Sequence, residues 1–73
     1  MRPNSIPNIP RKRYPQLDAL LWDNALEEIP EDFAFQIYET RWRFVEREKM
    51  DAGESRLLDY LTRKYGNGLF LAG

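Results

Sequence analysis

The side chains of this 73-residue chain that could carry chemistry are carboxylates, lysines, arginines and two serines, because the sequence contains no histidine and no cysteine. Ser5 and Ser55 therefore have no imidazole base to activate them as nucleophiles. Transition metals are disfavoured as well, since thiolates and imidazoles are their usual ligands. No glycine-rich phosphate loop is present, because the four glycines stand in expected turns or at the C-terminal end. We expect no catalytic residue, no metal site and no cofactor, and we predict that the chain is not an enzyme.

One arginine occupies a position where a core residue is expected. Residues 33–48, FAFQIYETRWRFVERE, have the periodicity of a helix with five aromatic side chains, and Arg41 falls between two of its apolar stripes. A buried guanidinium cannot lose its charge, so it needs a carboxylate, backbone carbonyls or an aromatic face. Counting outward from the predicted turn makes Asp18 the preferred partner of Arg41. The alternatives are a stem packed on Trp22 or Tyr38, and a guanidinium that faces a ligand.

The charge is distributed unevenly, although the formal net charge is only −1. Residues 1–14 carry four bases and no acid, and residues 15–39 carry seven acids and no base. Three consecutive bases, Arg11, Lys12 and Arg13, could enter a DNA minor groove as homeodomain arms do. Nucleic-acid binding through these three residues is therefore the alternative function. The exposed side of the third predicted helix mixes acids and bases, which suits a phosphate backbone poorly.

Proline positions indicate which segments hold these residues. Four prolines within residues 1–15 exclude a helix or an interior strand there, and we interpret residues 1–14 as a flexible basic arm. Pro15 suits the first turn of a helix. Ile29 and Pro30 should end that helix, because the residue before a proline is displaced from helical geometry.

Capping patterns predict two further helices. Asp32 is placed to cap the second helix, because its carboxylate can accept from free amides of the first turn. Asp51 followed by Glu54 matches a capping box, which predicts the start of a third helix with Leu61 on its apolar face. Gly66 is the expected left-handed residue that ends this helix.

These elements predict an all-α fold, a small three-helix bundle formed by residues 15–73. Short loops make neighbouring helices antiparallel. The proline-rich basic N-terminal arm precedes the bundle, and a short apolar C-terminal tail, LFLA, folds back on it. A chain this short has a modest core and no disulfide, so its stability depends on efficient helix packing or on a partner.

The aromatic side chains of the predicted bundle indicate a binding function. Because the second helix is packed by a helix on each side, many of its aromatic side chains are explained as core residues. Trp22, Phe35 and Trp42 lie at the margins of the apolar faces, however, and grouped exposed aromatics mark contact surfaces. We therefore predict a protein–protein interaction module. Its partner could be a second copy of the chain, which would form a weak homodimer. The predicted partner-binding residues are Trp22, Phe35, Arg41 and Trp42, and no motif is specific enough to assign the chain to a family.

The location expected from the sequence is the cytoplasm. No apolar run follows the basic residues near the N-terminus, so a secretory signal is not indicated. No apolar stretch approaches the roughly 20 residues that cross a bilayer, and we expect no membrane partner.

Overall fold

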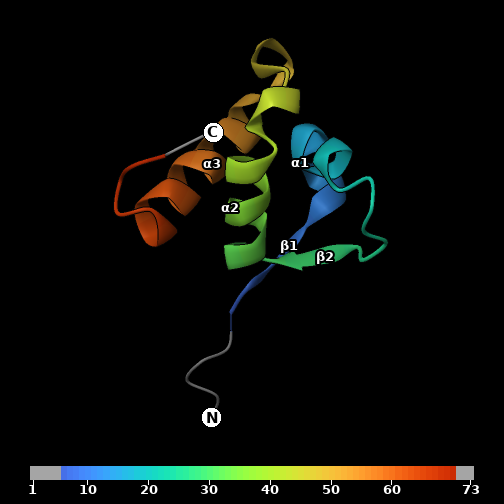
Figure 1. The fold of residues 1–73 in the computed structure, drawn as a ribbon, viewed down its shortest axis with the longest axis horizontal. Helices are drawn as coiled ribbons and strands as arrows, with labels where there is room; N and C mark the ends of the chain where they lie inside the picture. Colours follow the sequence, from blue (N-terminus) through green and yellow to red (C-terminus); the bar gives the residue numbers. More distant parts are fainter. Residues whose placement is uncertain (1–5, 71–73) are drawn as a thin grey trace.

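The computed structural model describes residues 6–70, which form three α-helices and a two-stranded antiparallel sheet (Figure 1). In chain order the elements are β1 (Asn8–Pro10), the 3-10 helix η1 (Arg11–Arg13), α1 (Pro15–Leu20), β2 (Glu28–Pro30), α2 (Glu31–Thr40), the 3-10 helices η2 (Trp42–Phe44) and η3 (Arg47–Lys49), and α3 (Ala52–Tyr65). α2 lies at the centre, with α1 on one side and α3 on the other (Figure 1).

The prediction of an all-α fold is wrong, because part of the proline-rich segment forms a strand. β1 pairs antiparallel with β2, and Ile9 lies opposite Ile29. Both isoleucines belong to the core, with 4% and 0% of their surface exposed. Residues 8–13 of the predicted arm thus lie in β1 and η1, and residues 1–5 lie outside the described residues.

The strand prolines are tolerated because of the register of the sheet. Ladder hydrogen bonds run from the N–H of Arg11 to the Glu27 carbonyl (3.1 Å) and from the N–H of Glu31 to the Pro7 carbonyl (3.0 Å). Since N–H groups alternate in direction along a strand, the prolines of β1 and β2 stand where an N–H would point out of the sheet. A missing donor costs no ladder hydrogen bond there.

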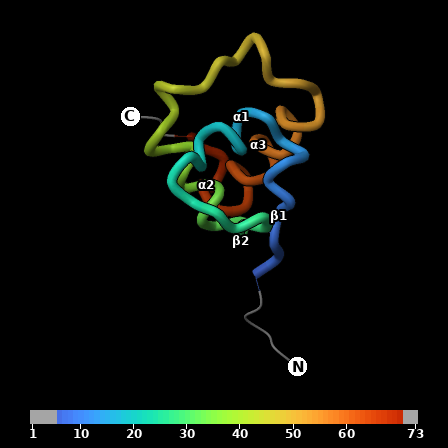
Figure 2. Tube along the Cα trace, turned by 90° about the vertical axis from the view of Figure 1, so that its right-hand side faces the viewer, coloured from blue at the N-terminus to red at the C-terminus, as the bar shows by residue number. Residues whose placement is uncertain are grey.

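The first two helices are shorter than their apolar patterns predict. α1 ends at Leu20, and α2 ends at Thr40 with Arg41 as its C-cap residue. The chain then runs through η2 and η3 in an arch that extends away from the helices (Figure 2). Gln16 Oε1 accepts a hydrogen bond from the Glu46 N–H at 2.8 Å. A contact with α1 therefore replaces helical hydrogen bonds in this segment.

The predicted start of α3 is confirmed. The Asp51 side chain accepts a hydrogen bond from the Glu54 N–H at 2.8 Å. Leu61 is fully buried, as its position on the apolar face predicts. The Glu54 carboxylate does not complete a reciprocal capping box, because it binds groups of α1 and α2 instead.

The end of α3 differs from the prediction. Gly66 has a φ of −111°, and the positive φ values belong to Asn67 (52°) and Gly68 (85°). Glycine is required at position 66 for another reason, since a side chain there would collide with the Leu69 carbonyl and with the Phe35 ring.

The core joins all three helices to the sheet. Its buried apolar side chains are Ile9, Leu17, Leu20, Leu21, Ile29, Ala34, Phe35, Ile37, Tyr38 and Leu61. Within residues 6–70, no helix combines the length and the apolar character that crossing a membrane requires.

Candidate functional site

α1 has six residues, too few for a helix to be stable by itself in water, and a buried carboxylate satisfies its first turn. Glu54 is fully buried. Its oxygens accept from the N–H groups of Gln16 (3.0 Å) and Leu17 (2.8 Å) and from the Tyr38 hydroxyl (2.7 Å). Burial and the contact with Glu54 raise the pKa of Tyr38, so this hydroxyl remains a neutral donor. Glu54 therefore ties α3 to both α1 and α2.

The other end of α1 is satisfied by Arg11, which the sequence suggested as a nucleic-acid contact. Nε of Arg11 donates to Asp18 Oδ1 at 2.6 Å. The four remaining N–H groups donate to the carbonyls of Asp18 (3.0 Å), Leu21 (2.9 Å), Leu26 (3.1 Å) and Asn24. All five donors of a guanidinium are thus engaged. Arg11 has no donor left for a phosphate, and its role is to hold the chain that follows α1.

The two other suggested nucleic-acid residues are placed differently. Lys12 and Arg13 are exposed on η1. Nucleic-acid binding by this pair stays a prediction, and it has lost one of the three cations on which it was based.

Arg41 pairs with Asp23, and the prediction of Asp18 as its partner is wrong. Its Nη1 and Nη2 donate to the two oxygens of the Asp23 carboxylate, each at 2.9 Å, and Nη1 also donates to the Leu20 carbonyl at 2.8 Å. The hydrogen bond from Arg41 holds the pKa of Asp23 below its ordinary value. The prediction assumed that the first helix continues to Ile29, whereas α1 ends at Leu20. The residues opposite Arg41 are therefore not those that an unbroken helix would place there.

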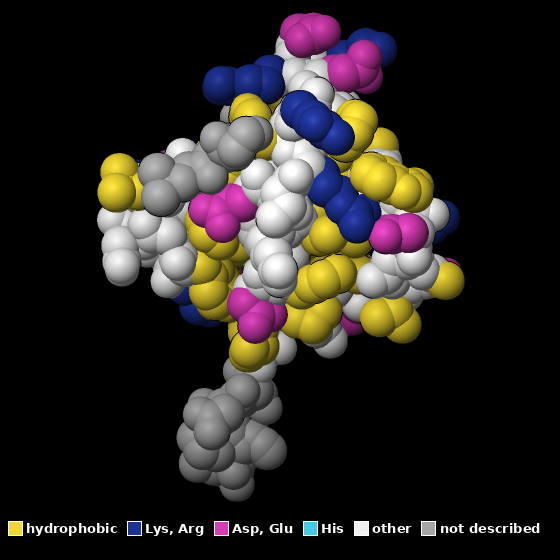
Figure 3. All heavy atoms as spheres, in the orientation of Figure 1, with side chains coloured by type: hydrophobic (Ala, Val, Ile, Leu, Met, Phe, Trp, Pro, Cys, Tyr) yellow, Lys and Arg dark blue, Asp and Glu magenta, His cyan; other side chains and the backbone are white. Residues whose placement is uncertain are grey.

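Two exposed aromatic side chains lie beside this ion pair. Trp22 and Phe44 are 61% and 53% exposed, and their rings meet edge to face with centroids 5.6 Å apart. The Arg41 guanidinium lies 4.3 Å from the Trp22 ring centroid, and that of Arg43 lies 5.0 Å from the Phe44 centroid. We call Trp22, Asp23, Arg41, Arg43 and Phe44 the Trp22–Phe44 surface. Figure 3 shows the side of the molecule over α1 and α2, where hydrophobic side chains border both basic and acidic ones.

Phe35 and Trp42, the other two predicted partner-binding residues, do not join this surface. Phe35 is 6% exposed and stacks on Tyr65 with ring centroids 6.3 Å apart. Both Phe35 and Trp42 contact Phe70, at centroid distances of 6.0 and 4.8 Å. The predicted tail thus folds back as far as Phe70, which packs on these two aromatics, and its residues 71–72 lie outside the described residues.

Three members of the Trp22–Phe44 surface were not identified as site residues from the sequence. Phe44 lies within residues 33–48, where the periodicity predicts one continuous helix with apolar stripes, whereas α2 ends at Thr40. Asp23 and Arg43 were not singled out at all. The signal that could have found them is the alternation of cations and aromatics in RWRF, residues 41–44, since guanidinium groups stack on aromatic faces.

A further polar cluster surrounds Glu31, whose Oε1 accepts from Lys64 Nζ (2.9 Å), the Tyr60 hydroxyl (3.1 Å) and the Tyr65 hydroxyl (3.0 Å). Burial opposes the charged form of Glu31, but these hydrogen bonds outweigh it and lower the pKa of the carboxyl. Burial and the contact with Glu31 raise the pKa of Tyr65. The cluster therefore joins α2 to α3 as a carboxylate with neutral and cationic donors. In the part of the chain that the structure describes, no group of acidic side chains is arranged to hold a metal ion.

Comparisons of this chain with protein-family models, with curated proteins and with solved structures find no match.

Proposed function

We propose that this chain is a protein-interaction domain without enzymatic activity that binds through the Trp22–Phe44 surface. The observation that carries the proposal is the exposure of its two central aromatics, Trp22 at 61% and Phe44 at 53%. Large aromatic side chains, tryptophan above all, contribute much of the binding energy at protein interfaces. A cytoplasmic location is part of the proposal, since a chain without cysteine does not depend on an oxidising compartment to fold.

The surface is ordered before any partner arrives. Arg41 lies over the Trp22 ring, and the Asp23 carboxylate and the Leu20 carbonyl hold the guanidinium in place. The edge-to-face contact with Phe44 fixes the indole further. Side chains that are already ordered lose less conformational entropy on binding, so more of the contact energy appears as affinity.

The partner that this surface fits is a second copy of the chain. Within residues 6–70, Arg43 has no carboxylate partner. The Asp23 side chain is 54% exposed, and a carboxylate has acceptor positions beyond the two that Arg41 uses. A two-fold axis makes every contact twice, so Arg43 of each copy meets Asp23 of the other while the rings pack between them. The same patch thus supplies the cation, the anion and the apolar centre of a weak homodimer.

Sedimentation equilibrium over a wide range of concentration tests this proposal. The wild-type chain is expected to dimerise weakly. Trp22→Ser is expected to raise the dimer Kd by more than about tenfold, because truncating a central interface aromatic costs about 2 kcal/mol. The matched control is Leu69→Ser, which removes a side chain that is 63% exposed on the C-terminal tail and should leave the Kd unchanged.

Far-UV circular dichroism and thermal melts of both variants separate binding from folding. The proposal fails if the wild-type chain stays monomeric up to millimolar concentration. It fails equally if Leu69→Ser weakens the dimer as much as Trp22→Ser does, because the association would then be a general effect of exposed apolar surface.

A further inference from the structure

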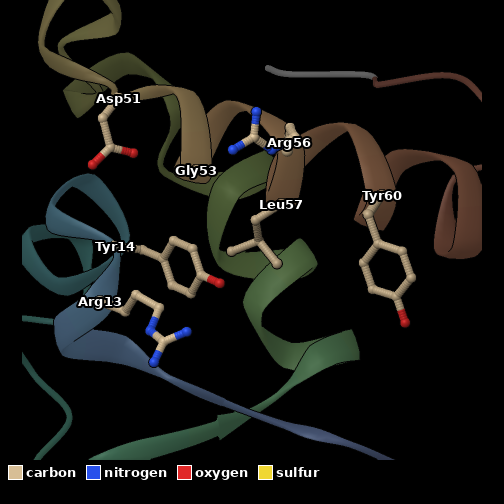
Figure 4. Close-up of a pocket in the computed structure, with 7 residues that line it drawn as sticks. All are labelled: Arg13, Tyr14, Asp51, Gly53, Arg56, Leu57 and Tyr60. Carbon is tan, nitrogen blue, oxygen red and sulfur yellow. The ribbon is translucent and has the colours of Figure 1, made fainter.

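A groove lies between η1 with the following Tyr14 and the first turns of α3 (Figure 4). It has a volume of about 480 Å³, and its lining includes Arg13, Tyr14, Arg56, Leu57 and Tyr60. Grooves of this size accommodate a ligand of several residues or a small organic molecule. None of these residues belongs to the Trp22–Phe44 surface, so binding here is independent of the proposed dimer.

The positive charge of the groove stands at two separate points. In Figure 4, Arg13 lies on the η1 side and Arg56 on the α3 side, at opposite rims, with the Tyr14 ring and Leu57 between them. Apart from Lys12, every other lysine or arginine in residues 6–70 contacts a carboxylate or an aromatic ring, whereas Arg13 and Arg56 contact neither. Asp51, the acidic residue of the lining, caps α3 through Oδ1. Each rim therefore offers one guanidinium to a separate anionic group.

The surface between the two arginines is apolar and aromatic. Tyr14 and Leu57 are half-buried there. Tyr60 lies farther along α3, and its hydroxyl donates to Glu31 at 3.1 Å, which fixes the position of that ring. The hydroxyl of Tyr14 has no hydrogen-bond partner within residues 6–70, unlike those of the three other tyrosines, and is free to donate to a ligand. A ligand that fits this groove carries an apolar group in its middle and an anionic group on each side of it.

We propose that this groove binds an extended acidic peptide in which two carboxylates flank an apolar side chain at every second residue. Side chains of an extended chain alternate between two faces, so the first, third and fifth residues point the same way. The two outer carboxylates then pair with Arg13 and Arg56, one at each rim, through charge-assisted hydrogen bonds. The central apolar side chain packs on Tyr14 and Leu57.

The separation of the two arginines favours a peptide over a single-stranded nucleic acid. Proteins that bind single strands line a groove with cations that follow the phosphate backbone and stack the bases on aromatic rings. Here one guanidinium stands on each rim with apolar surface between them, which suits two isolated carboxylates on either side of an apolar group.

Titrations of the full chain with capped pentapeptides, followed by the NMR shifts of its backbone amides, test the ligand class. The probe is the peptide ESLSE, which is expected to shift the amides of residues 13–14 and 53–60. The peptide QSLSQ lacks both charges and is expected to bind about tenfold more weakly. The peptide ESGSE lacks the apolar side chain and is expected to bind about fivefold more weakly. Equal affinity for ESLSE and either of these peptides would overturn the proposal, and so would tighter binding of a six-thymidine oligonucleotide at the same amides.

Three single-charge variants test the site. Arg13→Gln and Arg56→Gln are each expected to weaken ESLSE binding about threefold, since each removes one exposed ion pair. The control is Arg63→Gln, because Arg63 pairs with Asp59 on α3 and lies outside both the groove and the Trp22–Phe44 surface. It removes the same charge and is expected to change the affinity by less than about 1.5-fold, because solvent and salt screen distant surface charges. Equal losses in the three variants would mean general attraction of anions and would also overturn the proposal.

Half-charged peptides test whether each arginine binds its own carboxylate. In Arg13→Gln, either ESLSQ or QSLSE should bind as tightly as ESLSE, because the carboxylate that it lacks is the one that Arg13 binds. In Arg56→Gln, the other half-charged peptide should do so. The proposal fails if both half-charged peptides lose affinity equally in both variants. The three arginines are exposed, and circular dichroism establishes that the variants fold.

Discussion

Arg11 and Arg41 both donate hydrogen bonds to the end of α1 and to the loop after it, but they do so in different surroundings. Arg11 is 9% exposed and uses all five donors on one carboxylate and four carbonyls. Arg41 leaves 23% of its side chain exposed and binds Asp23, the Leu20 carbonyl and the face of Trp22. The first arginine ends inside the protein, and the second ends at a surface that a partner can reach.

This difference in burial separates the roles of the two arginines: Arg11 stabilises the fold, and Arg41 is available for binding. A buried guanidinium leaves unpaired carbonyls and an unpaired carboxylate when it is removed, and those groups are costly without water. An exposed guanidinium leaves groups that water can solvate, so its removal changes the order of the neighbouring ring more than the stability of the fold.

The largest expected effect is on stability at the buried arginine. Arg11→Ala should lower the free energy of unfolding by about 3 kcal/mol, because it leaves four carbonyls and the Asp18 carboxylate without their hydrogen-bond donor. Urea denaturation measures the loss. Lys12→Ala is the control, because Lys12 is adjacent to Arg11 but exposed. This variant should lose less than about 0.5 kcal/mol of the free energy of unfolding. A loss below about 1 kcal/mol for Arg11→Ala would contradict the assignment of Arg11 to the fold.

A smaller effect is expected at the exposed arginine, and it should appear in binding. Arg41→Ala is expected to raise the dimer Kd about two- to fivefold, because the cation–π contact that orders Trp22 is lost. Its urea midpoint should shift much less than that of Arg11→Ala. Sedimentation equilibrium measures the Kd, and tryptophan quenching follows the freed indole. Arg63→Ala, which removes an exposed ion pair with Asp59 on α3, should leave the Kd unchanged.

The smallest expected effect is the pH dependence of the ion pair between Arg41 and Asp23. Folding lowers the pKa of Asp23 from its ordinary value of 3.8. The pair therefore stabilises the fold above that value, and its contribution disappears as the pH falls through the lower folded pKa. NMR titration of the Asp23 carboxyl measures this pKa, which should return toward 3.8 in Arg41→Ala. An unchanged pKa in the variant would show that Arg41 is not its cause.

α3 is the element that sequence reasoning predicted best. The Asp51 cap, the buried position of Leu61 and the last helical residue, Tyr65, all follow from spacings within one segment of 15 residues, 51–65. Local hydrogen bonds and a 3.6-residue period are sufficient for such a helix. Trp22 and Arg41 were also identified from the sequence as members of a contact surface, which remains a proposal.

The sheet and the helix ends could not be predicted in the same way. β1 has three residues, and their three partners in the ladder lie about 20 positions away. Its proline argues against a strand unless the register is known. α2 ends at Thr40 although its apolar pattern continues, and Arg41 binds the Leu20 carbonyl and the Asp23 carboxylate, which lie 21 and 18 positions earlier in the chain. Contacts of this kind are not encoded in any local window.

The sequence by itself determined the absence of histidine and cysteine chemistry, the three helical regions and the cap of α3, since these depend on residue type and short-range spacing. The tertiary structure determined which charged side chains are buried and paired and which are exposed. Arg11 and Arg13 stand two positions apart in one basic run, yet one is buried with every donor engaged and the other is exposed at a groove. The reason is physical: a guanidinium is stable inside a protein only where carbonyls and a carboxylate converge on it, and the fold brings these together at Arg11 from residues 18–26.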